Sequence, residues 1–144
     1  MLTGVVIPLR TRKTSVKPLV GLALFAGCGE RDLLGLESLM TRVDVVAGRE
    51  LTRSGERGEE FFVVANGHAE VRQHGRVIAG LGPGSFFGEM ALLDGGLRTA
   101  TVIAATPMEL YVLSKREFRE LLDSSPTVAR NMLRSMSSRL RSAA

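Results

Sequence analysis

The spacing of apolar positions changes near residue 41. Leucines recur on one helical face over Asp32–Met40, which predicts a helix there. Residues 1–19 show no clear period and contain two prolines, so we predict a flexible arm over residues 1–20 with a short strand at Val5–Leu9. From Thr41 onward, the apolar residues fall into short runs typical of strands.

These runs of β-branched and aromatic residues alternate with turns. The strongest run, Phe61–Ala65, is followed by Asn66-Gly67, a pair typical of a tight hairpin turn. In Ala69–His74, small or apolar residues alternate with charged ones, which predicts one solvated face. The other predicted strands are Val43–Val46, Val77–Leu81, Ser85–Phe87, Thr99–Ala104 and Glu109–Leu113. This pattern predicts a mainly β fold, an antiparallel β-roll or jelly-roll barrel of about eight strands with flanking N-terminal and C-terminal helices.

Two helices are predicted after the strands. Ser114 and Glu117 form a capping box at the start of the first, and Ser125 caps the second, with Pro126 at its first position. The second helix carries an apolar stripe made of Val128, Ala129, Met132, Leu133, Met136 and Leu140. Such a stripe indicates packing on the chain's own roll or on a second copy of it.

The composition fits one globular domain. The chain has 144 residues, of which 44% are hydrophobic and 24% charged. No apolar run reaches the roughly 18 residues that span a membrane, and the first residues do not form a secretory signal. The single cysteine, Cys28, excludes an internal disulfide network and fits a reducing cytosol. We therefore expect a cytoplasmic protein with no membrane partner.

The net charge of +4 is unevenly distributed. Residues 1–20 carry four basic side chains and no acid, and residues 126–144 carry four arginines and no acid. The middle, residues 21–125, has 11 basic and 15 acidic residues and is therefore net acidic. The basic balance does not by itself indicate a nucleic-acid surface, and an anionic ligand would depend on local donors.

The stretch from Gly84 to Val102 concentrates the candidate chemistry. Gly88 allows a turn after a strand, Glu89 begins one predicted turn of helix, and Arg98 precedes the next strand. A helix N-terminus and an arginine both favour an anion, whereas a carboxylate accepts hydrogen bonds from a sugar hydroxyl. One anion plus one hydroxyl indicates a nucleotide or sugar phosphate. An ordinary surface ion pair between Glu89 and Arg98 is the alternative on these two residues alone.

Longer motifs around these residues resemble a known family. Phe87-Gly88-Glu89-Met90-Ala91-Leu92 and Arg98-Thr99-Ala100-Thr101-Val102 resemble, in order and spacing, the phosphate-binding cassette of the cyclic nucleotide-binding domain family. Leu97 stands where that family usually has proline. A second segment, Ser54–Val64 followed by Gly67, is similar to the family's loop and strand before the cassette. The resemblance covers about residues 24–140.

The resemblance implies a cyclic nucleotide-binding domain over residues 21–144, with the β-roll at about 41–114 and C-terminal helices at 115–142. Cyclic AMP is the favoured ligand, and the chain is expected to act as a regulatory sensor. The amide of Gly88 and the carboxylate of Glu89 would hold the ribose 2′-hydroxyl. Arg98, with the amides of Ala91 and Thr99, would hold the cyclic phosphate. The implied ligand-binding set is Gly88, Glu89, Met90, Ala91, Arg98 and Thr99.

The last helix would transmit the signal. In the family, this helix closes over the bound base, and Met132, Leu133 and Met136 are the candidates for capping it here. An effector protein or a second copy of the chain would then bind through this helix. The family includes DNA-binding regulators in which a helix-turn-helix follows, but none follows within these residues, so no nucleic-acid partner is expected.

Three other interpretations remain open. A hydroxyl at Thr99 helps cyclic GMP bind in parts of the family, so the sensor could prefer cyclic GMP. The fold could also be vestigial and serve as an interaction domain. A cupin-like metal enzyme needs several converging ligands, and the only histidines are His68 and His74 on one predicted strand. We therefore expect no catalytic residue, no metal and no cofactor other than the nucleotide ligand.

Overall fold

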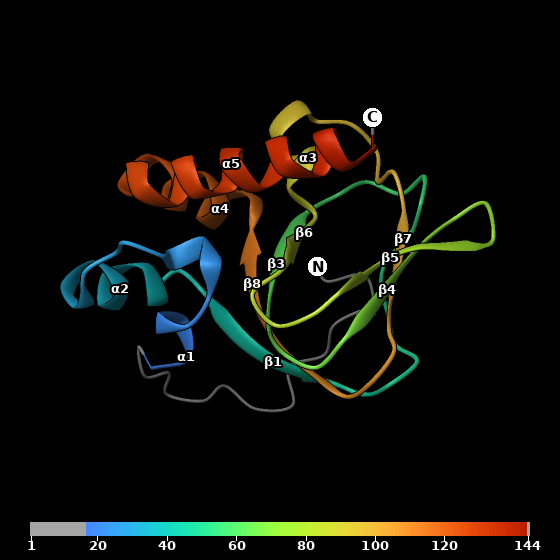
Figure 1. Ribbon diagram of the computed structural model, residues 1–144, viewed down its shortest axis with the longest axis horizontal. Coiled ribbons are helices and arrows are strands. Elements are labelled where there is room, and N and C mark those ends of the chain that lie inside the picture. Colours follow the sequence, from blue (N-terminus) through green and yellow to red (C-terminus); the bar gives the residue numbers. More distant parts are fainter. Residues whose placement is uncertain (1–16, 144) are drawn as a thin grey trace.

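The computed structural model describes residues 17–143 (Figure 1). The predicted strand Val5–Leu9 and residues 1–16 of the predicted arm lie outside the described residues. The elements in chain order are α1 (Lys17–Val20), the 3-10 helix η1 (Ala23–Phe25), α2 (Glu30–Glu37), β1 (Thr41–Val45), β2 (Glu50–Thr52), β3 (Glu60–Asn66), β4 (Ala69–Gln73), β5 (Arg76–Leu81), β6 (Phe86–Phe87), α3 (Glu89–Asp94), β7 (Thr101–Ala104), β8 (Met108–Ser114), α4 (Lys115–Ser124) and α5 (Pro126–Ala143). No helix in the described range has the length and hydrophobicity to cross a membrane.

The strands form two antiparallel sheets of four strands each. One sheet has the order β1-β8-β3-β6 and the other the order β2-β7-β4-β5. Figure 1 shows α1 and α2 on one side of the roll and α5 lying across the top, with its C-terminal end near α3. The predicted antiparallel roll of about eight strands with flanking helices is confirmed by this architecture.

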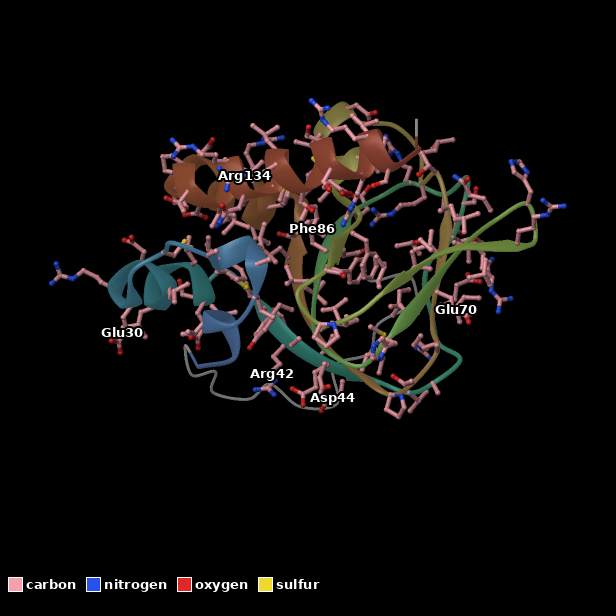
Figure 2. All side chains as sticks on the ribbon, viewed as in Figure 1. Glu30, Arg42, Asp44, Glu70, Phe86 and Arg134 are labelled. Atoms are coloured by element: carbon pink, nitrogen blue, oxygen red, sulfur yellow. The ribbon has the colours of Figure 1, made fainter. Side chains whose placement is uncertain are left out.

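The β3–β8–β6 region separates two hydrophobic clusters. Side chains alternate along a strand, so Phe61 and Val63 of β3 face the helices whereas Phe62 and Val64 face the interior of the roll. The same alternation sends Phe86 of β6 toward the helices and Phe87 into the roll, and Figure 2 shows Phe86 beneath α5. Burial on both faces explains why β3 reads as a continuous apolar run.

Several boundaries differ from the sequence expectations. The three-residue strand β2 was not predicted, because it lies in a polar stretch between the turns at Gly48 and Gly55. The helix predicted over Asp32–Met40 is α2, which begins at Glu30 and ends at Glu37. Leu19 of α1 is fully buried among the helices, so the folded body includes four residues that were assigned to the flexible arm. A four-residue helix is too short to show a period in the sequence.

Capping side chains begin both C-terminal helices as predicted. Ser114 and Glu117 make the reciprocal bonds of a capping box at α4. The Ser125 hydroxyl accepts from the amide of Val128 at 3.1 Å at the start of α5. Asn131 then ties α5 to η1, because its Nδ2 atom donates to the carbonyl oxygens of Leu24 and Ala26 at 2.9 Å each. These bonds hold the first half of α5 against the body.

Candidate functional site

A cavity of about 310 Å³ lies between the second sheet, the cassette and the end of α5. Its size falls within the range of about 300–1,000 Å³ that is common for small-molecule sites. Most of its wall is apolar and comes from β4, β5, β6 and β7. All six residues of the predicted ligand-binding set line it: Gly88, Glu89, Met90, Ala91, Arg98 and Thr99.

The side chain of Arg98 is buried and held by main-chain oxygens. Only 7% of the residue is exposed. Its Nη1 atom donates to the carbonyl of Gly88 at 2.8 Å, and its Nη2 atom donates to the carbonyl of Glu60 at 2.6 Å. Both partners are neutral, so they fix the guanidinium without cancelling its charge.

The loop before β3 positions the same arginine through its backbone. The amide of Arg98 donates to the carbonyl of Glu56 at 2.8 Å, and the amide of Gly55 donates to the carbonyl of Arg98 at 2.9 Å. Gly58 lies against the guanidinium: a Cβ atom at position 58 would lie 2.9 Å from the Arg98 Cζ atom and 2.5 Å from the Cβ of Ala91. The two segments that resemble the family in sequence are therefore joined at Arg98.

Gly88 is required by both its conformation and its surroundings. Its φ of 92° lies in the left-handed region, and a Cβ atom there would come within 2.8 Å of the Arg98 Nη1 atom and of the Glu60 carbonyl oxygen. This turn ends β6 and begins α3, so Glu89 is the first residue of that helix.

Acidic side chains surround Arg98 at longer range. Burial lowers the pKa of Arg98, and the negative charges of Glu60, Glu89 and Glu59 oppose that shift. Burial also raises the pKa of Glu60, and the charge of Arg98 acts in the opposite direction. Because a guanidinium is not deprotonated in proteins, Arg98 remains a fixed positive charge in the cavity wall despite the lowered pKa.

Glu89 is held by the last helix. Only 5% of the residue is exposed. Its Oε1 atom accepts from the Nη1 atom of Arg139 at 2.9 Å, and its Oε2 atom accepts from the amide of Met90 at 3.2 Å. Arg139 also donates from Nη2 to the carbonyl of Phe86 at 2.7 Å and lies 4.5 Å above the centre of the Phe86 ring. One arginine of α5 therefore links that helix to both β6 and α3.

The lining residues that the sequence did not predict include Arg139 and Gln73. Arg139 lies three residues after Met136 and seven after Met132 on one face of α5, and this helical spacing was the signal that could have indicated it. Gln73 is the third member of the alternation that begins with Ala69 and Val71. The signal in the sequence was a polar residue, Gln73, at the end of a row of apolar residues that faces the interior of the roll.

The three candidates for base capping do not line the cavity in this structure. Met132 is buried in the cluster between the helices and the first sheet, and Met136 packs against that cluster. Leu133 points to solvent with 66% of its surface exposed. Of the described residues of α5, Arg139 is the one that lines the cavity.

Within the described residues, no group of three or more His, Cys, Asp or Glu side chains is placed to hold a metal ion. The cavity instead combines one buried cation, one buried carboxylate and an apolar wall. This combination suits a small anionic ligand that also carries a hydroxyl group and an apolar part.

The comparison with known families agrees with this class of site. A sequence model described as the cyclic nucleotide-binding domain matches residues 42–125. The match covers more than half of the chain and includes the cassette and the loop that positions Arg98. The chain belongs to the cyclic nucleotide-binding domain family.

Individual relatives come from two kinds of protein. A cyclic nucleotide-gated potassium channel of Mesorhizobium japonicum is 41% identical over 106 residues, which are 74% of this chain and 29% of the channel. A cyclic AMP receptor protein of Thermus thermophilus is 34% identical over 128 residues, which are 85% of this chain and 59% of that protein. The chain spans between about a third and three fifths of the length of these relatives.

A solved structure confirms the fold. The catabolite activator protein of Thermus thermophilus superposes with a TM-score of 0.76 at 32% sequence identity, and the match covers 84% of this chain and 59% of that one. The fold, the family and the cavity lined by the cassette are therefore all consistent with a cyclic nucleotide-binding regulatory domain.

Proposed function

We propose that this chain binds cyclic AMP in the cavity and acts as a cyclic AMP sensor. The observation that carries the proposal is that Arg98 and Glu89, both buried, line one cavity whose remaining wall is largely apolar. The cyclic phosphate binds Arg98, and the ribose 2′-hydroxyl donates to the Glu89 carboxylate. The purine occupies the apolar space against β4, β5 and β7.

Two further observations support this assignment. Arg98 is positioned by neutral carbonyl oxygens, so its charge is available to a phosphate without rearrangement of the loops. The relative from Thermus thermophilus carries the name cyclic AMP receptor protein, and it spans most of this chain. No catalytic step is part of the proposal, which concerns recognition of the ligand in a reducing cytoplasm.

The second part of the proposal concerns transmission through α5. Arg139 holds the carboxylate that the ribose needs, so ligand binding and the position of the end of α5 are coupled. When the ribose takes the Glu89 carboxylate, Arg139 is released and the C-terminal part of α5 moves. Met132, Leu133 or Met136 can cap the base only after α5 has moved from the position described above. A second copy of the chain or an effector protein would read this movement.

The experiment that tests the proposal is isothermal titration of the nucleotide-free protein with cyclic AMP and cyclic GMP in parallel. Cyclic AMP is expected to bind with one site per chain and more tightly than cyclic GMP. Tighter binding of cyclic GMP would assign the sensor to the other nucleotide. No heat and no thermal shift with either nucleotide at millimolar concentration would show that the fold no longer binds a ligand.

A further inference from the structure

The polar side chains of the cavity wall divide by the part of a nucleotide that they suit. Arg98 and Glu89 suit the phosphate and the sugar, and Arg139 is engaged by Glu89. The hydroxyl of Thr52 donates to the carbonyl of Ala100 at 3.1 Å, so its hydrogen is already used. The polar side chains that remain in the wall to meet the edge of a base are Gln73 and Thr99.

Gln73 faces the cavity because of its place in β4. Glu70 and Arg72, the alternate residues of that strand, point away and pair with each other at 2.9 Å. Val71 and Gln73 lie on the opposite face and line the cavity. The amide group of Gln73 therefore stands at the end of an apolar row.

A main-chain oxygen fixes the orientation of this amide. The Nε2 atom of Gln73 donates to the carbonyl of Thr99 at 2.9 Å. A carbonyl oxygen only accepts, so the nitrogen and not the oxygen of the amide must face it. The Oε1 atom and the second hydrogen on Nε2 remain, and they present one acceptor beside one donor.

This pair of groups matches adenine better than guanine. Adenine presents a donor at its N6 amino group beside an acceptor at N7, and an amide side chain forms two hydrogen bonds with that edge. Guanine presents acceptors at both O6 and N7, so its O6 atom would face the Oε1 atom of Gln73. An amide that is held by Thr99 cannot turn over to relieve this mismatch.

We propose that Gln73 reads the base and selects adenine over guanine. Its Oε1 atom accepts from the N6 amino group, and its free Nε2 hydrogen donates to N7. The carbonyl of Thr99 acts as the positioning partner that fixes the amide. This inference rests on the proposed function, since it names the residue that gives the same cavity its preference.

The test is isothermal titration of wild type and Gln73→Leu with cyclic AMP and with purine riboside cyclic monophosphate, which lacks the N6 amino group. Wild type is expected to bind cyclic AMP about ten- to a hundredfold more tightly than the analogue, the range for one good amide–adenine pair. In Gln73→Leu the ratio of the two affinities is expected to fall to about one. The preference of the protein for cyclic AMP over cyclic GMP is also expected to become smaller.

The ratio separates base reading from a structural role. If Gln73 only stabilised the loop at Thr99, its loss would weaken all three nucleotides equally and leave the ratio unchanged, which overturns the inference. Gln73→Asn, which keeps the amide but shortens it by one methylene, is the second variant if Gln73→Leu does not fold, and the same loss of the ratio is expected. Failure of wild type to bind any of the nucleotides overturns the proposed function itself, whereas binding with an unchanged ratio overturns the role of Gln73 alone.

Discussion

Two arginines line the cavity, one from the roll and one from α5, and they are held in different ways. Arg98 is buried, and its guanidinium donates to two main-chain oxygens. Arg139 has 44% of its side chain exposed and donates to one carboxylate and one main-chain oxygen. The first arginine belongs to a loop of the roll, and the second to the C-terminal part of the long helix α5.

The partners decide what each arginine can do for a ligand. Neutral carbonyls hold the guanidinium of Arg98, and the acidic side chains near it act at longer range, so Arg98 is available to an incoming phosphate. The charge of Arg139 is already matched by the buried Glu89, and because 44% of the arginine side chain is exposed, solvent screens this ion pair to about 1 kcal/mol or less. The contacts of Arg98 are therefore in place before a ligand binds, whereas the ion pair of Arg139 with Glu89 can be broken at a small cost in free energy.

The largest effect is expected from removal of the fixed arginine. Arg98→Ala should weaken binding of cyclic AMP about 10²–10³-fold, because loss of one partner of a buried charge costs roughly 3–5 kcal/mol. Arg98→Lys should also bind weakly, because it loses the planar fork. Isothermal titration measures both, with a thermal melt to show that each variant is folded. An unchanged dissociation constant in Arg98→Ala would remove the phosphate assignment.

Stabilisation of the folded protein by cyclic AMP should depend on Arg98 and much less on Arg139. At a concentration of cyclic AMP one hundred times the dissociation constant, the free energy of unfolding should rise by about 2.7 kcal/mol, which for a domain of this size raises the melting temperature by roughly 5–10 °C. Differential scanning fluorimetry should show this shift in wild type and in Arg139→Ala. At the same concentration of cyclic AMP the shift should be nearly absent in Arg98→Ala, and a full shift there would contradict the difference between the two arginines.

The carboxylate between the two arginines should discriminate between sugars. Wild type should bind cyclic AMP about tenfold or more tightly than 2′-deoxy cyclic AMP, because the analogue lacks the hydroxyl that donates to the buried Glu89 carboxylate, a hydrogen bond worth about 1–3 kcal/mol. Glu89→Ala should bind both more weakly and nearly equally. Competition titrations with the two nucleotides measure the ratio. Equal binding of both by wild type would show that Glu89 does not hold the ribose.

The smallest effect is expected on the helix side. Arg139→Ala should bind cyclic AMP up to about fivefold more tightly, since the ribose no longer competes with an ion pair worth about 0–1 kcal/mol. The same variant should lose amide protection in the last two turns of α5 without ligand, as measured by hydrogen exchange. Arg134→Ala is the matched control, because Arg134 is exposed on the same helix (Figure 2).

Two results for Arg139→Ala would change the interpretation. Markedly weaker binding would mean that Arg139 contacts the nucleotide instead of competing with its sugar. Unchanged protection of α5 in the free protein would mean that Asn131 and the buried face around Met132 hold the whole helix, so that the signal leaves by another part of the fold.

The parts of the fold that were predicted correctly are those that depend on residues close together in the sequence. The strands around Asn66-Gly67, the capping box at Ser114 and the cap at Ser125 each depend on residues a few positions apart. The cassette residues line one cavity, because a strand, a turn at Gly88 and a short helix bring most of them together locally, and their role in binding a ligand stays a prediction.

The parts that were missed depend on contacts between distant segments. Arg139 meets Glu89 across fifty residues, and nothing near either residue indicates the other. Gln73 meets Thr99 because β4 pairs with β7, a register that the sequence pattern does not specify. The apolar stripe of α5 was predicted as one surface, but Leu133 and Leu140 face solvent because they lie away from the sides of the helix that η1 and α4 cover.

The contact of Gly58 with Arg98 has a practical consequence for protein engineering. The space beside the guanidinium belongs to a residue forty positions earlier, and any side chain at position 58 would have to displace either the arginine or Ala91. A designer who transplants the cassette alone into another roll would therefore bring the arginine without the gap that receives it. The smallest transferable unit of this site comprises both the cassette and the loop around Gly58.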